Sequence, residues 1–282
     1  MSFWYTLVDL LPFEWAQPGR MLFMKNALLA VLVISPLFGL LSTMVVEKRM
    51  SFFSDALGHS AFTGIAAGTL AGFSDPSWCA VALAVCFALL FTLVRERTRL
   101  ASDTVIGVFS STAVALGIFL STLGGRSFTK FNTLLVGDIL SVTPGRIGLL
   151  AVILALVILL WCLSLNRLTL SAIHPALARS RGIRLWAQEA LFNCAVAVVV
   201  TLTMTWVGLL VINSLLVLPG AAARNVSANL RQYTLYSLLT AIGAGIAGLM
   251  MSYYIGASAG ASITLLCALC FAATYLLRGK AL

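Results

Sequence analysis

The chain has 282 residues, of which 61% are hydrophobic and only 10% are charged, and its formal net charge is +9. Soluble domains carry roughly 25% charged residues, so this composition excludes an ordinary soluble protein and predicts a polytopic membrane protein. The positive charge does not indicate a nucleic-acid partner. The basic residues fall in short loops between apolar runs and form no stripe with interleaved aromatic residues.

The first 21 residues differ from the rest of the chain. They have neither the basic start nor the small-residue cleavage site of a signal peptide. Trp4, Tyr5 and Trp15 are aromatic residues of the kind that rests at the headgroup level of a bilayer. We therefore expect two regions, an interfacial N-terminal segment at 1–21 and a transmembrane domain at 22–282.

Apolar runs long enough to cross a bilayer recur along the remaining chain. A spanning helix needs about 20 mostly apolar residues. The candidate segments are 22–46, 56–73, 77–94, 104–123, 147–165, 186–206, 207–223, 233–252 and 259–277. No clear loop separates the segment 186–206 from the segment 207–223, so we expect eight or nine spans. The sequence predicts an all-α bundle of transmembrane helices.

An aspartate and a histidine stand at the start of the second candidate span. Asp55 and His59 are four residues apart, so on a helix their side chains project from one face. Ionisable side chains in lipid are costly and mark functional sites, and a carboxylate with an imidazole suits first-row divalent cations. Thr63 continues the same face one turn later and would add an oxygen. We predict a transient metal-ion site here.

Two structural alternatives stay open for this pair of residues. Asp55 would also cap the helix N-terminus, where the helix dipole favours a carboxylate. His59 would also serve as a hydrogen-bonding partner for a neighbouring helix. Two protein ligands are too few for a tight, closed metal site. Such a weak site suits a transporter, because the ion must also leave.

The segment 124–146 is too apolar for a plain loop. We expect a surface helix or a short re-entrant piece, with the pair Gly137-Asp138 interrupting its pattern. Non-helical backbone at membrane depth is tolerated only where it is buried in protein or faces water.

A polar stretch at 166–185 interrupts the spans and predicts a short helix. Ser171 or His174 precedes this helix, Pro175 occupies its first turn, and Gly182 ends it in left-handed geometry. An amphipathic helix of this kind either floats at the headgroups or docks into a partner, and the residues alone leave both readings open. His174 is not favoured as a metal ligand, because no other ligand lies near it in the sequence.

The apolar run 207–224 holds polar groups at mid-span and a helix breaker. Asn213 and Ser214 place polar side chains there, and Pro219 is expected to break or kink the helix. Broken helices near the midplane build the pathway in many transporters, whereas a lone proline kink is often purely structural. Asn213 and Pro219 are therefore candidate pathway residues.

Basic residues in the short loops predict the orientation in the membrane. The connections 47–50, 95–103, 166–184 and 224–232, with the C-terminal tail, hold thirteen of the 18 Lys and Arg residues. Because cytoplasmic loops carry such an excess, we expect a cytoplasmic C-terminus and, with nine spans, an N-terminus outside.

Four blocks of sequence together resemble one known family. The run from Lys48 to His59 matches a family hallmark, a basic turn followed by an aspartate, one helical turn and a histidine. The blocks 98–107, 137–140 and 208–224 match three further family blocks in the same order. From about residue 22 onward, the chain is similar to the integral-membrane permease of the ATP-binding-cassette importers for zinc, manganese and iron.

This resemblance implies a fold like that of type II importer permeases, in the plasma (inner) membrane of a prokaryote. It implies a second permease copy, cytoplasmic ATPase subunits and an extracytoplasmic metal-binding protein as partners. The metal-coordinating pair in the translocation path would be Asp55 and His59. No cofactor is expected to stay bound, and a divalent ion, zinc or manganese with iron as a further candidate, would pass through as substrate.

The resemblance also implies that the segment 171–183 is a coupling helix that docks on the ATPase. Its coupling residues would be Ser171, His174, Pro175, Ala178 and Gly182. The family often has an aspartate where this chain has His174. The chain contains no P-loop, so we expect a permease that is not itself an enzyme. The alternative function is a stand-alone cation channel or proton-coupled metal carrier, which has no need of a docking helix.

Overall fold

Every regular element in the described part of the chain is a helix. The computed structural model describes residues 2–9, 12–19, 21–98, 100–123 and 137–278. The elements are α1 (Ser2–Val8), η1 (Glu14–Ala16), α2 (Leu22–Glu47), α3 (Phe53–Leu70), α4 (Ser77–Arg97), α5 (Ser102–Leu123), η2 (Ile139–Ser141), α7 (Pro144–Ile173), α8 (Pro175–Ser180), α9 (Leu185–Val207), α10 (Leu209–Val226), α11 (Leu230–Ile255) and α12 (Ala259–Arg278). The predicted all-α class is confirmed.

Each of the nine predicted spans corresponds to a helix of the bundle. Within the described residues, eight helices are long and apolar enough to cross a membrane, namely α2, α4, α5, α7, α9, α10, α11 and α12. The remaining segment is α3, which has 18 residues. It is less hydropathic than the others because polar residues, Asp55 and His59 among them, lie along it.

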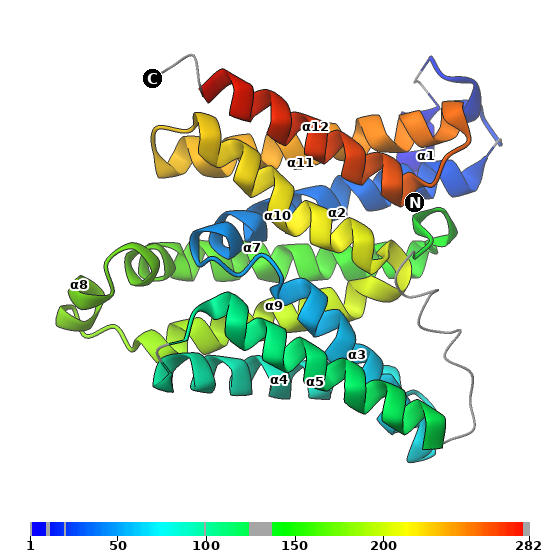
Figure 1. Cartoon of the computed structure of the whole chain (residues 1–282). Coiled ribbons are helices and arrows are strands. Elements are labelled where there is room, and N and C mark those ends of the chain that lie inside the picture. The colour runs from blue at the N-terminus through cyan, green and yellow to red at the C-terminus, as the bar shows by residue number, and fades with distance from the viewer. Residues whose placement is uncertain (1, 10–11, 20, 99, 124–136, 279–282) are drawn as a thin grey trace.

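The doubtful boundary between the sixth and seventh segments is a sharp turn at one residue. Gly208 has a φ of 87° and separates α9 from α10, and the chain reverses direction there (Figure 1). Only glycine adopts such a backbone angle without strain. Gly137 packs directly on this turn, because a Cβ added to Gly137 would lie 2.1 Å from the Gly208 nitrogen. The residues before Gly137 in the predicted apolar piece, 124–136, lie outside the described residues.

The helices form two groups that meet across the middle of the molecule. One group contains α2, α10, α11 and α12, and the other contains α3, α4, α5 and α9, with α7 beside α2 and α9 (Figure 1). Small residues allow close approach within each group. A Cβ added to Gly64 of α3, for example, would lie 2.6 Å from the Ala80 Cα of α4. The contact between α3 and α10 joins the two groups.

The connections alternate between the two ends of the bundle as the loop charges predict. The connections after α2, α4 and α10 lie at one end, together with α8 and the end of α12. The connections after α3, α9 and α11 lie at the other end, near α1 (left and right in Figure 1, respectively). The described members of the larger basic set therefore gather at one end.

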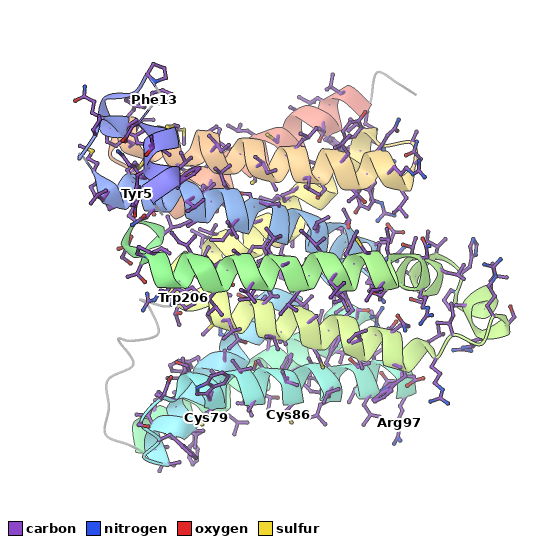
Figure 2. All side chains as sticks on the ribbon, turned by 180° about the vertical axis from the view of Figure 1, so that it is seen from behind. Tyr5, Phe13, Cys79, Cys86, Arg97 and Trp206 are labelled. Atoms are coloured by element: carbon purple, nitrogen blue, oxygen red, sulfur yellow. The ribbon has the colours of Figure 1, made fainter. Side chains whose placement is uncertain are left out.

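The N-terminal segment folds back onto the start of α2. The Trp4 indole donates to the Lys25 carbonyl at 3.0 Å, and the Lys25 ammonium forms an ion pair with Asp9. Trp15 has no exposed surface and stacks on Phe13 with ring centroids 5.6 Å apart. The Trp15 ring is therefore packed inside the protein, and its position at headgroup level stays a prediction. Figure 2 shows Tyr5 and Phe13 at this end of the bundle.

Candidate metal-ion site

The carboxylate of Asp55 lies in the first turn of α3, where the helix dipole favours a negative charge. The N-cap residue of this helix is Phe52, which makes no side-chain capping hydrogen bond. Asp55 therefore does not serve as the cap, and its carboxylate is directed to other side chains. Phe53, beside it, is fully buried and packs on Phe91 of α4 with ring centroids 4.9 Å apart, which anchors the start of the helix.

Asp55 and His59 lie together as their spacing predicts. The His59 Nε2 is 3.4 Å from the Asp55 Oδ2, and the side chains are 18% and 42% exposed, respectively. The two side chains are therefore not fully enclosed by this chain. Within the described residues, no group of three or more His, Cys, Asp and Glu side chains is arranged to hold a metal. One chain thus contributes a carboxylate and an imidazole, which is an incomplete set for a closed site.

A third polar side chain reaches the pair from the other group of helices. The Asn213 Nδ2 of α10 donates to the Asp55 Oδ1 at 3.3 Å. The sequence indicated Asn213 only as a pathway residue, and the structure brings it to the carboxylate although the two residues are 158 positions apart. The arrangement therefore joins α3 and α10 through a hydrogen bond at the candidate site.

Thr63 does not join this cluster. Its single hydroxyl proton is shared between the Ala113 carbonyl of α5, at 2.6 Å, and the His59 carbonyl, at 3.0 Å, and the residue is only 3% exposed. The suggested third ligand is therefore committed to packing α3 on α5. Helical spacing gave Thr63 the correct turn but did not show which neighbour that turn faces.

The predicted short helix between the spans is present as α8. Pro175 is its first residue, as predicted, and His174 rather than Ser171 immediately precedes it. Gly182, with a φ of 74°, follows the helix in left-handed geometry. Leu177 is 45% exposed on α8 and Ile173, at the end of α7, is 52% exposed. The helix thus presents apolar side chains at the end of the bundle that carries most basic residues.

Two of the five predicted coupling residues face inward. Ser171 belongs to the last turns of α7, is 4% exposed and donates to the Leu168 carbonyl at 2.7 Å. Ala178 has no exposed surface. Their side chains are therefore unavailable to a partner at this surface, because each packs against the chain's own helices. His174, Pro175 and the backbone around Gly182 are exposed.

Pro219 does not end its helix. α10 continues from Leu209 to Val226 through the buried Pro219, so the predicted break is wrong and the predicted kink stays a prediction. The Gly220 nitrogen donates to the Ser42 Oγ at 2.8 Å, which ties this turn of α10 to α2. The burial of Pro219 and the hydrogen bond from Gly220 to Ser42 support a structural role for the proline.

An ionic cluster that the sequence analysis missed links α9 to the turn before α3. Glu189 lies 3.7 Å from the Lys48 Nζ and 3.6 Å from an Arg95 nitrogen. Burial lowers the pKa of Lys48, and the neighbouring Arg95 lowers it further, while Glu189 opposes both. The sequence indicates Arg95 only as a loop charge, and Lys48 as a loop charge and as part of the basic turn before Asp55. An acidic residue within the first turns of a predicted span was the signal that could have found Glu189.

Comparison with known proteins places this chain among transport proteins. The model of the ABC 3 transport family matches residues 20–278. The manganese import system permease protein ScaB of Streptococcus gordonii is 28% identical over 258 residues, which cover 92% of this chain and 92% of ScaB. The high-affinity zinc uptake system membrane protein ZnuB of Haemophilus influenzae is 27% identical over 249 residues, which cover 87% of this chain and 94% of ZnuB.

A solved structure agrees with this comparison. The structure of PsaBC from Streptococcus pneumoniae in complex with Fab has a TM-score of 0.76 and 25% sequence identity, and the match covers 98% of this chain and 95% of that chain. The family match, at residues 20–278, includes every described helix from α2 to α12. This chain is a multi-pass membrane protein and belongs to the ABC 3 transport family.

Proposed function

We propose that this protein is the permease subunit of an ATP-driven importer of divalent transition-metal ions. The single observation that carries the proposal is the Asp55–His59 pair, with its two side chains 3.4 Å apart and partly exposed in an otherwise apolar bundle. A carboxylate and an imidazole suit these ions, and an ionisable pair within a membrane bundle is costly unless it has a function. The names of ScaB and ZnuB support manganese and zinc as candidate substrates.

The incomplete ligand set supports assembly with a second copy of the permease. One chain offers two ionisable ligands, and a matching pair from a second copy would bring four ligands around one ion on a shared axis. A site assembled from two chains would open when the copies move apart. The ion would then bind weakly enough to leave, which transport requires.

Energy for this movement would come from a separate ATPase. The helix α8 offers exposed apolar side chains at the end of the bundle with most basic residues, which is the end that the loop charges assign to the cytoplasm. ATP binding and hydrolysis in the partner would reorient the helices through α8. An extracytoplasmic metal-binding protein would deliver the ion at the opposite end. The membrane in question would be the plasma (inner) membrane of a prokaryote.

Replacing His59 with Ala tests the proposed site. The variant loses one of two ligands per chain, so metal uptake by cells that depend on this importer should fall to background. The side chain is partly exposed, so the complex should still assemble. Uptake of radioactive manganese and zinc measures the effect, and the amount of permease in membranes serves as the control for assembly. Unimpaired uptake of both metals by this variant would refute the site.

A further inference from the structure

Asn213 carries two polar groups beside the candidate site, and within the described residues only one of them has a hydrogen-bond partner. Its amide nitrogen donates to Asp55. Its amide oxygen is buried and has no hydrogen-bond partner among the described residues. Leaving a buried polar atom unpaired is unfavourable, and a native structure rarely does so without a water or an ion at the atom. The amide that carries this oxygen lies beside the Asp55 carboxylate, which in turn contacts the His59 imidazole. Carboxylates and imidazoles are both metal ligands.

The packing of α3 on α10 places Asn213 in this position. A Cβ added to Gly58 would lie 2.5 Å from the Leu209 Cδ2, so the leucine rests directly on the glycine backbone. Asn213 is four residues after Leu209 and therefore lies on the same face of α10, one turn further along. Asp55 is three residues before Gly58 and lies on the corresponding face of α3. Antiparallel packing then sets Asn213 opposite Asp55, where the hydrogen bond is found.

Zinc binds more tightly than manganese to almost any fixed set of nitrogen and oxygen ligands, so a site that admits manganese must select it by ligand type and geometry. Imidazole suits zinc, whereas carboxylate and amide oxygens suit manganese. An additional oxygen beside Asp55 and His59 shifts the set towards the harder ion. The choice between these two substrates therefore depends on what lies next to the ionisable pair.

We propose that Asn213 is a specificity-determining residue of this site. Its amide N–H orients the Asp55 carboxylate, and its amide oxygen supplies the passing ion with a further oxygen ligand, which favours manganese over zinc. This inference rests on the proposed function, because it assigns a substrate preference to the same site. It names a residue of α10 as a metal contact in addition to the pair on α3.

The test compares variants of Asn213 in the complete importer. The variant Asn213→Ala removes both the oxygen and the N–H donor. Asn213→Asp keeps an oxygen at the same position and replaces the donor to Asp55 with a second carboxylate oxygen, which also suits manganese. Asn225→Ala is the matched control, because Asn225 lies on the same helix and makes an amide hydrogen bond of the same length, 3.3 Å, to Thr274 far from the site. The KM and maximal rate of uptake are measured separately for manganese and zinc, with the amount of permease in membranes determined for each variant.

Loss of one oxygen ligand should raise the KM for manganese about tenfold, which corresponds to about 1.4 kcal/mol, and should change the KM for zinc by less than about threefold. Asn213→Asp should retain the preference for manganese, and Asn225→Ala should leave both KM values unchanged. Equal changes for both metals in Asn213→Ala, or a loss of the preference in Asn213→Asp, would overturn the inference. If Asn213→Ala does not fold, less permease will be found in membranes. In that case the ratio of the two KM values in Asn213→Asp decides whether the inference holds.

These outcomes are separate from those of the proposed function. If His59→Ala abolishes uptake of both metals and Asn213→Ala leaves the ratio of the two KM values unchanged, only the role of Asn213 is wrong. If His59→Ala leaves uptake intact, the site itself is wrong, and a change of ratio in Asn213→Ala would no longer concern that site.

Discussion

The contact between Gly58 and Leu209 sets how closely α3 and α10 approach each other. Any side chain at Gly58 must displace Leu209, because an added Cβ would lie only 2.5 Å from its Cδ2. Asp55 and Asn213 lie one turn away on the same two helix faces, and their hydrogen bond is already 3.3 Å long. A displacement of Leu209 is therefore expected to separate these two side chains.

We expect the variant Gly58→Val to destabilise the protein and weaken the site together. Overpacking of this kind costs about 1–3 kcal/mol, and separation of Asn213 from Asp55 should raise the KM for metal uptake. Thermal unfolding of the purified permease and uptake kinetics measure the two effects. Gly107→Val is the matched control, because a Cβ at Gly107 of α5 meets nothing within 4 Å.

The double variant Gly58→Val with Leu209→Ala makes room for the added methyl groups and should recover part of both losses. A normal KM in Gly58→Val, despite a lower unfolding temperature, would show that the close approach of α3 and α10 matters for stability alone. Sequence spacing did not reveal this contact, because Gly58 and Leu209 are distant in the chain.

At the scale of elements, α8 and α9 connect the end of the bundle that carries most basic residues to α3, the helix that carries the candidate site. α9 begins five residues after α8 ends, and Glu189 in its first turns pairs with Lys48 and Arg95. Lys48 directly follows α2 and precedes α3 by a short turn. A displacement of α8 by a partner would thus act on elements already tied to the start of α3.

The exposed Leu177 of α8 is expected to anchor the ATPase. A central apolar residue of a docked helix contributes about 2 kcal/mol or more, so Leu177→Glu should weaken association about 30-fold and should reduce the ATPase that copurifies with the permease. Val226→Glu is the matched control, because Val226 is similarly exposed, at 42%, but lies at the end of α10.

Normal copurification with Leu177→Glu would show that α8 does not dock in this way. If no ATPase copurifies with the unaltered permease, the stand-alone channel or carrier becomes the better account. The inward-facing Ser171 and Ala178 are not suitable for this test, because their substitution would disturb the packing of α7 and α8 on the chain itself.

At the scale of the whole molecule, the connections alternate between two ends, and the described members of the larger basic set lie at one end. α1 and the end of α12 lie at opposite ends of the bundle (Figure 1). The excess of Lys and Arg favours the cytoplasm for the end that carries α8. Within the described residues, nine long helices (α2 to α5, α7 and α9 to α12) cross the bundle, and this odd number places the start of α2 and the end of α12 at opposite ends.

This orientation predicts the behaviour of reporter fusions. A fluorescent protein fused to the C-terminus should fluoresce, and alkaline phosphatase fused there should be inactive. Alkaline phosphatase inserted in the connection 71–76, after α3, should be active, because that connection lies at the opposite end. A phosphatase fusion in the connection 98–101 serves as the cytoplasmic control. The reverse pattern of activities would contradict the assigned orientation.

The sequence by itself determined the features that depend on local spacing and composition. Apolar runs of sufficient length identified the nine long helices of the described residues, with boundaries within about three residues except at the end of α7, which continues eight residues past the predicted 165. The distance of four residues placed Asp55 and His59 on one helix face, because helical geometry is set by the backbone. Pro175 and Gly182 marked α8 for the same reason, since both restrict the backbone locally.

Only the tertiary structure decided which helix each of those faces meets. Thr63 lies on the predicted turn but faces α5, and Asn213 reaches Asp55 from another group of helices. Glu189 pairs with Lys48 and Arg95, two basic side chains that the sequence places in different loops. The physical reason is that helical periodicity defines the angular position of a side chain around its own axis. The neighbour at that angle depends on packing between segments that can be more than a hundred residues apart.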